Sequence, residues 1–270
     1  MLFTSDSKPM VEVTGLDIKF RLRLNAENSI RARFIELVSS PLSFGRRRSE
    51  MLHVLKSVRF RAVRGDRIAI LGRNGAGKST LCRFLAGIYR SEQVKIDSRY
   101  QVRAVLEPGL VVYPELTGRE NAKLLIGLIY PELSAETAAE LLDEVLAFSE
   151  LGTFLDTPFR HYSNGMQARL CLSVATARAS DVFILDEVFD AADKPFRERI
   201  SRKVLGLIKE AGVVFFVSHT EAQARLVCNK AIVLEAGEVK FFGGIDEGYA
   251  VYNMLLEAGR GSVKDTSEQV

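Results

Sequence analysis

A glycine-rich stretch at residues 72–80, GRNGAGKST, constrains the fold of this chain more than any other feature. It follows a short apolar run, RIAIL at 67–71, and precedes a second apolar run, LCRFLAGIY at 81–89. Glycines at this spacing let backbone N–H groups turn inward around an anion, and the following helix adds the positive end of its dipole. The stretch therefore predicts a phosphate-binding loop between a buried parallel strand and a helix, within an α/β fold.

The residue types of this loop have predicted tasks toward a nucleoside triphosphate. Lys78 reaches the β- and γ-phosphates, and the Ser79 hydroxyl ligates Mg²⁺. The predicted nucleotide contacts in the loop are Gly72, Asn74, Gly75, Ala76, Gly77, Lys78, Ser79 and Thr80. The loop alone leaves kinases, GTPases and ATPases open. A GTPase should add an NKxD-type motif, and NKAI at 229–232 lacks the aspartate.

Two further apolar runs, DVFIL at 181–185 and VVFFV at 213–217, predict buried strands. Asp186 follows the first run and would hold Mg²⁺ through water, and Glu187 would orient the attacking water or accept its proton. His219 follows the second run and would hydrogen-bond the γ-phosphate. Ligands of such sheets bind at the carboxyl ends of the strands, so we expect these side chains to meet the loop there.

A helix start is predicted at residues 162–167, YSNGMQ, where Ser163 would cap a helix over 168–179. The free N–H groups of such a helix start form an anion site. By itself this is an ordinary helix start, and it becomes specific only together with the other motifs in their order.

The ordered set resembles the ATP-binding cassette (ABC) family over residues 11–245. The matching segments are 72–80 (Walker A), 162–166 (signature), 181–187 (Walker B with the catalytic Glu187), 190–193 (the D-loop, ending in Asp193) and His219 (switch histidine). The resemblance implies an ATPase that uses ATP and Mg²⁺ as a head-to-tail homodimer. In that dimer, Ser163 and Gly165 of one subunit would close over the γ-phosphate of ATP held by the other, with Asp193 at the same site.

Four positions depart from the family pattern, and two of them, Asn164 and Met166, lie within the signature segment. The place of the Q-loop glutamine holds Glu107, whose carboxylate is expected to ligate Mg²⁺ or position water. His53 falls where an aromatic side chain usually stacks on adenine, and we expect its imidazole to take that contact.

Further details resemble one subfamily. PELTGREN at 114–121 and YSNGM at 162–166 look like exporters of capsule, O-antigen or teichoic-acid polysaccharides. This implies a subunit that drives lipid-linked polysaccharide across the cytoplasmic membrane through a transmembrane permease dimer, at the cytoplasmic face of the inner membrane. The alternatives are a cassette for another exported or imported substrate and, less favoured, a soluble cassette that acts on nucleic acid or ribosomes. Net charge is only +3, so we expect no nucleic-acid partner.

The expected fold is a P-loop NTPase core of ABC type, with a mostly parallel sheet, an antiparallel β part and an inserted helical subdomain. We expect one ABC ATPase domain at 1–258, with the helical subdomain at about 107–174, a basic insertion at about 29–48 and a flexible tail at 259–270. Outside the runs named above, strands are predicted at 11–22 (at a sheet edge) and 54–63, a hairpin at 231–242, and helices at 29–40, within 113–150, at 195–209 and at 249–257.

Composition excludes several other classes. The three cysteines are scattered, which argues against a disulfide framework or a zinc site. The longest run without Asp, Glu, Lys or Arg is residues 211–220, short of the about 18 apolar residues that a membrane span needs. Residues 1–65 carry 13 basic and 6 acidic side chains, so this part of the chain could face anionic lipid or an anionic ligand.

Overall fold

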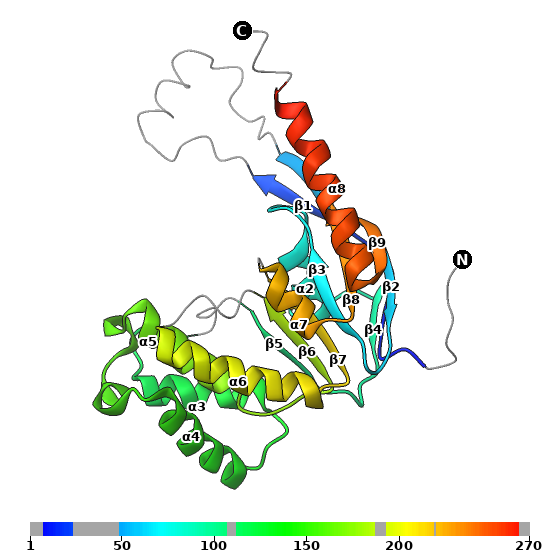
Figure 1. Ribbon diagram of the computed structural model, residues 1–270. Coiled ribbons are helices and arrows are strands. Elements are labelled where there is room, and N and C mark those ends of the chain that lie inside the picture. The colour runs from blue at the N-terminus through cyan, green and yellow to red at the C-terminus, as the bar shows by residue number, and fades with distance from the viewer. Residues whose placement is uncertain (1–7, 24–48, 107–111, 187–192, 219, 265–270) are drawn as a thin grey trace, which may run out of the picture.

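The computed structural model describes residues 8–23, 49–106, 112–186, 193–218 and 220–264, which form two sheets flanked by helices (Figure 1). The main sheet of these residues has the order β5-β6-β7-β3-β8-β9. Its strands are β3 (Arg67–Leu71), β5 (Val102–Val105), β6 (Val182–Asp186), β7 (Val213–Val217), β8 (Lys230–Glu235) and β9 (Glu238–Gly244). The helices are α2 (Lys78–Leu85), α3 (Gly118–Ile129), α4 (Ala135–Ser149), α5 (Asn164–Ala175), α6 (Lys194–Glu210), α7 (Glu221–Val227) and α8 (Ile245–Lys264), with short 3-10 turns η1 (Gly152–Asp156) and η2 (Phe159–His161). Neighbouring strands pair in parallel except β8 and β9, which form the predicted hairpin.

The inner strands β3, β6, β7 and β8 of the main sheet are buried on both faces, and three of them are predicted from continuous apolar runs. Along β3, Ile68 and Ile70 enter one core, whereas Ala69 and Leu71 enter the other. The first core is closed by α2 and the smaller sheet, and the second by α5, α6 and α8. The parallel sheet therefore lies between two apolar layers, which leaves the carboxyl ends of its strands as the place where a ligand of such a sheet binds.

The smaller sheet is antiparallel and has the order β2-β1-β4, with β1 (Val11–Arg23), β2 (Ser49–Ala62) and β4 (Val94–Ile96). The prediction that residues 11–22 form an edge strand is wrong in its position, because β1 lies in the centre of this sheet. The three-residue β4 pairs with the first residues of β1, where Val11 lies opposite Ile96. So short a strand carries little signal in the sequence.

Helices α3, α4 and α5 form a separate group to one side of the main sheet (Figure 1). They share an apolar core that includes Leu125, Leu141 and Leu170. Tyr130, at the end of α3, donates its hydroxyl to the Val174 carbonyl of α5 at 2.7 Å, so it holds the C-terminal part of α5. The helical content expected between residues 113 and 150 is confirmed, while the subdomain limits at 107 and 174 stay a prediction.

The ends of helices α2 and α8 differ from the sequence expectation. Helix α2 ends at Leu85 rather than running to residue 89, because Gly87 adopts a left-handed φ of 73°. Helix α8 continues to Lys264, past the expected end of the domain at 258. The expected helix at 29–40, the basic insertion and residues 265–270 lie outside the described residues. Within the described part of the chain, no helix has the length and apolar character to cross a membrane.

Candidate nucleotide-binding site

The phosphate-binding loop joins the end of β3 to the start of α2, as predicted. Gly77 is the N-cap of α2 and has a φ of 104°, a left-handed conformation that favours glycine. Glycine has no side chain that could cap the helix, so the first N–H groups of α2 remain available to an external acceptor. The positive end of the helix dipole points the same way, which makes this helix start an anion site.

Two glycines of the loop are also required by close packing. A Cβ atom on Gly72 would lie 2.5 Å from the carbonyl oxygen of Leu234 in β8. A Cβ atom on Gly77 would lie 2.8 Å from Cδ2 of Leu55 in β2. The loop is thus seated between backbone segments of both sheets, which fixes its position in the core.

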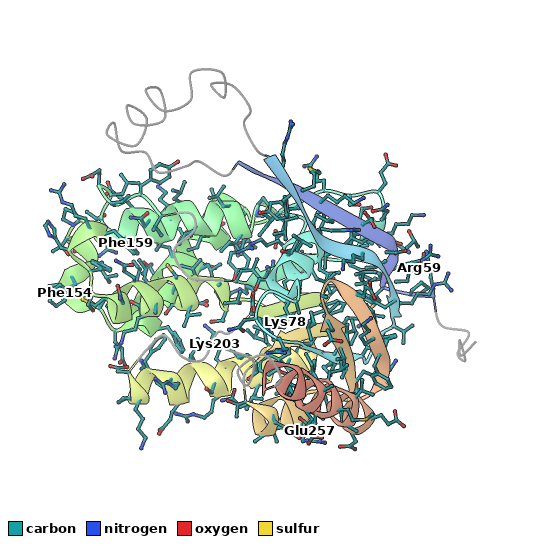
Figure 2. The ribbon with its side chains drawn as sticks, turned by 90° about the horizontal axis from the view of Figure 1, so that it is seen from above. Arg59, Lys78, Phe154, Phe159, Lys203 and Glu257 are labelled. Atoms are coloured by element: carbon teal, nitrogen blue, oxygen red, sulfur yellow. The ribbon has the colours of Figure 1, made fainter. Side chains whose placement is uncertain are left out.

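Lys78 extends back over this loop. Its Nζ donates to the Gly72 carbonyl at 2.9 Å and to the Arg73 carbonyl at 3.2 Å. Figure 2 shows Lys78 near the middle of the molecule, between the helical group and the sheets. A cation held above inward-facing N–H groups is suited to bind the β- and γ-phosphates of a nucleotide.

Asp186 and Ser79 bring oxygen ligands to the loop. Asp186 is the last residue of β6 and lies opposite Val217 at the end of β7. Burial, together with the nearby Asp186 carboxylate, raises the pKa of the Cys82 thiol in α2, whereas Lys78 acts in the opposite direction. The Asp186 carboxylate therefore lies near α2, and Ser79 sits half-buried in the first turn of this helix. Carboxylate and hydroxyl oxygens are ligands that Mg²⁺ prefers, so these residues fit the ion.

Three predicted site residues, Glu107, Glu187 and His219, lie outside the described residues. Their roles stay predictions. Their attachment points are described: β6 ends directly before Glu187, and its parallel neighbour β7 ends two residues before His219. The two carboxyl ends are adjacent at one edge of the sheet, as expected.

His53 lies on β2, and its ring Nε2 is 3.1 Å from both carboxylate oxygens of Asp17 on β1. The next residues of β2, Val54 and Leu55, contact the position of Gly77 in the loop. His53 is therefore close in sequence to the backbone that supports the loop, and its contact with adenine stays a prediction.

The start of α5 confirms the predicted cap. The Ser163 hydroxyl accepts a hydrogen bond from the Met166 N–H at 3.3 Å. Gly165 is open to its surroundings, since the nearest atom to a Cβ there would be Ser163 Oγ at 3.9 Å. These residues border a cleft of about 520 Å³ that also includes Arg169 and Asp193 but no residue of the phosphate-binding loop. One chain thus keeps the two anion sites apart.

Asp193 is the N-cap of α6 and accepts from the Phe196 N–H at 3.3 Å. Arg169 of α5 lies 2.5 Å from the Asp193 carboxylate, and this hydrogen bond lowers the pKa of Asp193. The same guanidinium lies over the Phe196 ring at 5.2 Å and reaches Glu150 at 3.6 Å. Sequence analysis did not identify Arg169, because its link to Asp193 depends on how α5 and α6 pack.

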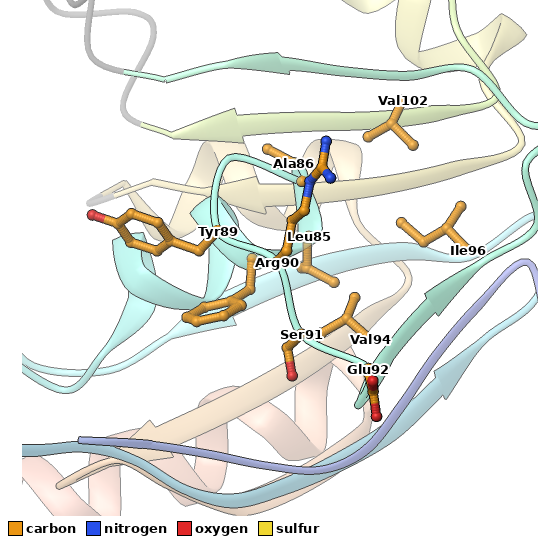
Figure 3. A pocket seen from close by; sticks show the side chains of 11 residues that line it. Leu85, Ala86, Tyr89, Arg90, Ser91, Glu92, Val94, Ile96 and Val102 are labelled. Carbon is orange, nitrogen blue, oxygen red and sulfur yellow. The ribbon is translucent and has the colours of Figure 1, made fainter. Parts of the chain in front are cut away.

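A second hollow, of about 530 Å³, lies at the C-terminal end of α2 (Figure 3). It is bordered mainly by the segment after α2, including Tyr89 and Arg90, and by Val94, Ile96 and Val102 of β4 and β5. It shares no residue with the phosphate-binding loop, so it is not part of the candidate nucleotide site.

The sequence of this chain is similar to those of known ATP-binding proteins. The family model described as "ABC transporter" matches residues 55–190. The O-antigen export system ATP-binding protein RfbB of Myxococcus xanthus is 32% identical over 78% of this chain and 48% of its own length. RfbB of Klebsiella pneumoniae is 31% identical over 75% of this chain and 81% of its own length. The teichoic acids export ATP-binding protein TagH of Enterococcus faecalis is 30% identical over 84% of this chain and 50% of its own length. This chain thus spans about half the length of two of these curated relatives.

A solved structure supports the fold. The ATP-binding cassette MJ0796, in a dimeric post-hydrolysis state, superposes with a TM-score of 0.64 at 21% identity, over 87% of this chain and 99% of its own. The expected fold class is confirmed by this likeness and by the mixed sheet with its antiparallel part. The chain belongs to the ABC transporter family.

Proposed function

We propose that this chain is the ATP-hydrolysing subunit of an exporter that moves lipid-linked polysaccharide, of capsular, O-antigen or teichoic-acid type, across the cytoplasmic membrane. The observation that carries the proposal is the similarity to ATP-binding proteins of O-antigen and teichoic acid export. The motifs at 114–121 and 162–166 support the same assignment.

The catalytic unit in this proposal is a head-to-tail dimer of two copies. Its support is the separation of the two anion sites, since the cleft at the start of α5 includes no residue of the loop at 72–77. In the dimer, Lys78 and the N–H groups of α2 bind the phosphates from one side. Ser163 and Gly165 of the second copy cover the γ-phosphate from the other side. The cassette MJ0796 is itself dimeric, which agrees with this arrangement.

Mg²⁺ would be held by the Ser79 hydroxyl and, through water, by Asp186, with Glu107 as a further oxygen ligand. When bound, it neutralises charge that develops on the phosphate oxygens. Glu187 would orient the attacking water and accept its proton, and His219 would hydrogen-bond the γ-phosphate. Water is excluded when the second copy closes on the site, which strengthens each of these electrostatic contacts.

The transport partner in this proposal is a transmembrane permease dimer. The cassette would sit at the cytoplasmic face of the inner membrane and be held there through the permease. The helical group α3–α5 would pass the closure of the ATP dimer to that partner. The basic segment at 29–48 would lie near the anionic lipid surface or the glycolipid.

A glycan localisation assay in the source cell carrying Glu187→Gln tests this proposal. We expect surface polysaccharide to be lost and lipid-linked polysaccharide to accumulate inside. Glu198→Gln, on the exposed side of α6, is a matched control and should leave surface polysaccharide unchanged. Normal surface glycan in cells with Glu187→Gln would overturn the substrate class and leave the ATPase assignment intact.

A further inference from the structure

The motif PELTGREN pairs along its length with the segment that leads into the signature helix. The Phe159 N–H donates to the Leu116 carbonyl at 2.8 Å, and the Arg160 N–H donates to the Pro114 carbonyl at 3.0 Å. Side chains reinforce this pairing. The flanking ion pairs are Arg160–Glu115 at 2.6 Å and Arg119–Asp156 at 2.9 Å. Residues 113–121 therefore form a platform under the chain that enters α5, and we call them the platform below.

The platform has a fixed shape of its own. Asn121 is fully buried, and its side-chain amide accepts from the Tyr113 N–H at 2.8 Å and donates to the Tyr113 carbonyl at 2.9 Å. Thr117 and Glu120 form a reciprocal capping box at the start of α3. These bonds satisfy the polar groups of the turn internally, so the platform does not depend on a ligand for its conformation.

Tyr162 is the last residue before the Ser163 cap, and its ring lies against the platform at Gly118. Its hydroxyl donates to the Phe154 carbonyl at 2.7 Å, and its ring lies 5.0 Å from the ring of Phe159. A Cβ atom on Gly118 would lie 1.9 Å from the Tyr162 hydroxyl oxygen and 2.8 Å from Cζ. The tyrosine thus fits in this position because residue 118 is glycine. The two motifs meet at this contact.

We propose that Gly118 and Tyr162 form a positioning pair that sets where Ser163 and Gly165 meet the nucleotide of the second copy. This inference rests on the composite dimer of the proposed function. The Tyr162 backbone is continuous with Ser163, and its carbonyl also accepts from the Gln167 side chain at 3.2 Å. A shift of the tyrosine ring therefore moves the cap and the first turn of α5 together.

The pair is tested with purified full-length protein by comparing wild type, Gly118→Ala, Tyr162→Leu and the double variant Gly118→Ala/Tyr162→Leu. The readouts are kcat and KM for ATP hydrolysis, the affinity for a fluorescent ATP analogue, and the melting temperature. Gly127→Ala is the matched control, because Gly127 is exposed on the same helix and a Cβ there meets no atom within 4 Å.

We expect Gly118→Ala to lower kcat about 10- to 100-fold, because small displacements of groups that contact the reacting centre cost this much. Affinity for the ATP analogue should stay unchanged, since the phosphate-binding loop is not touched. The double variant should regain much of the lost kcat, because leucine has no hydroxyl to collide with the new methyl group. Tyr162→Phe should lower kcat less than Gly118→Ala.

Two results would overturn the inference: unchanged kcat in Gly118→Ala, or a loss of kcat that Tyr162→Leu does not relieve although the variants remain folded by melting temperature. Failure of the proposed dimer is recognised separately. Wild-type protein that stays monomeric by light scattering in the presence of a non-hydrolysable ATP analogue and Mg²⁺ would count against the dimer itself.

Discussion

Helices α2 and α5 each begin at a candidate anion site, but the two starts are built differently. The N-cap of α2 is Gly77, in a left-handed conformation and with no side chain to occupy the N–H groups. The N-cap of α5 is Ser163, in extended conformation, and its own hydroxyl accepts from the Met166 N–H. The first start needs an external acceptor, whereas the second is partly satisfied in the single chain. The difference agrees with a primary phosphate site on α2 and a closing surface on α5.

Their supports differ as well. The loop before α2 is enclosed by the two sheets, with Gly72 against Leu234 and Gly77 against Leu55. The start of α5 stands on the platform and belongs to a helical group with its own apolar core. The first site is thus part of the rigid sheet core. The second belongs to a helical group with a core of its own, although Ala168 and Leu172 of α5 also pack against the main sheet.

The largest effect is expected from Lys78→Ala. Loss of the ammonium removes the cation above the loop, and turnover of ATP should fall about 100- to 1,000-fold, as for loss of other preorganised charge-stabilising groups. Steady-state phosphate release measures it. The control Lys95→Ala removes an exposed cation on β4 and should keep wild-type turnover. A Lys78→Ala enzyme within tenfold of wild type would contradict the role of α2.

The next effect concerns α5. Gly165→Glu places a carboxylate in the first turn of α5. The helix dipole stabilises a negative charge there, but the carboxylate repels a phosphate. Turnover should fall at least about tenfold, because like charges brought together cost several kcal/mol. Binding of a fluorescent ATP analogue at the α2 site should be unchanged. Gly165→Gln is the neutral control, and equal losses in both variants would show that charge is not the cause.

A smaller effect is expected on stability, where two glycines of the loop should differ. Gly77→Ala combines a left-handed φ of 104° with contact to Leu55, and should lower the free energy of unfolding by about 3 kcal/mol. Gly75→Ala has a φ of 80° but open space around its Cβ, and should cost about 1 kcal/mol. Urea unfolding measures both. An equal loss of unfolding free energy in both variants would mean that contact with β2 does not fix the position of the loop.

The smallest effect is expected on the rate at which the buried cysteine thiols are alkylated. Cys82 lies on α2 and Cys171 on α5, and burial raises the pKa of Cys171 to about 11 and that of Cys82 well above its ordinary value. Since only the thiolate reacts, alkylation at pH 8 should be slow at both sites and should speed up as the pH rises. Mass spectrometry after iodoacetamide treatment measures each site. We expect ATP with Mg²⁺ to slow Cys82 more than Cys171, and equal slowing would weaken the contrast between the two helices.

Much of the core could be predicted because it depends on local signals. The strand at 67–71 and the strand at 213–217 have the predicted bounds, since each is a buried apolar run with a glycine beside it. The Ser163 cap is also predictable from a local signal, because an N-cap serine bonds to an N–H group within one turn of its own position.

The remaining features depend on contacts between residues far apart in the chain. The central place of β1 requires pairing with β4, which has too few residues to be seen in the sequence. Arg169 meets Asp193 only after α5 and α6 pack, and Tyr162 meets Gly118 only through the platform. These are steric and electrostatic relations between elements, and no periodicity within one element encodes them.

The central claim is that α2 of one copy and α5 of another clamp the same ATP, and subunit mixing tests it most directly. The Lys78→Ala protein is mixed with the Gly165→Glu protein at varied ratios, and the ATP turnover of each mixture is recorded. A mixed dimer contains one intact site, so the account predicts turnover above that of either variant alone, with its maximum near equal amounts. Lys78→Ala mixed with the double variant Lys78→Ala/Gly165→Glu contains no intact site and should show no gain. Turnover that never exceeds the sum of the separate variants would contradict the composite site.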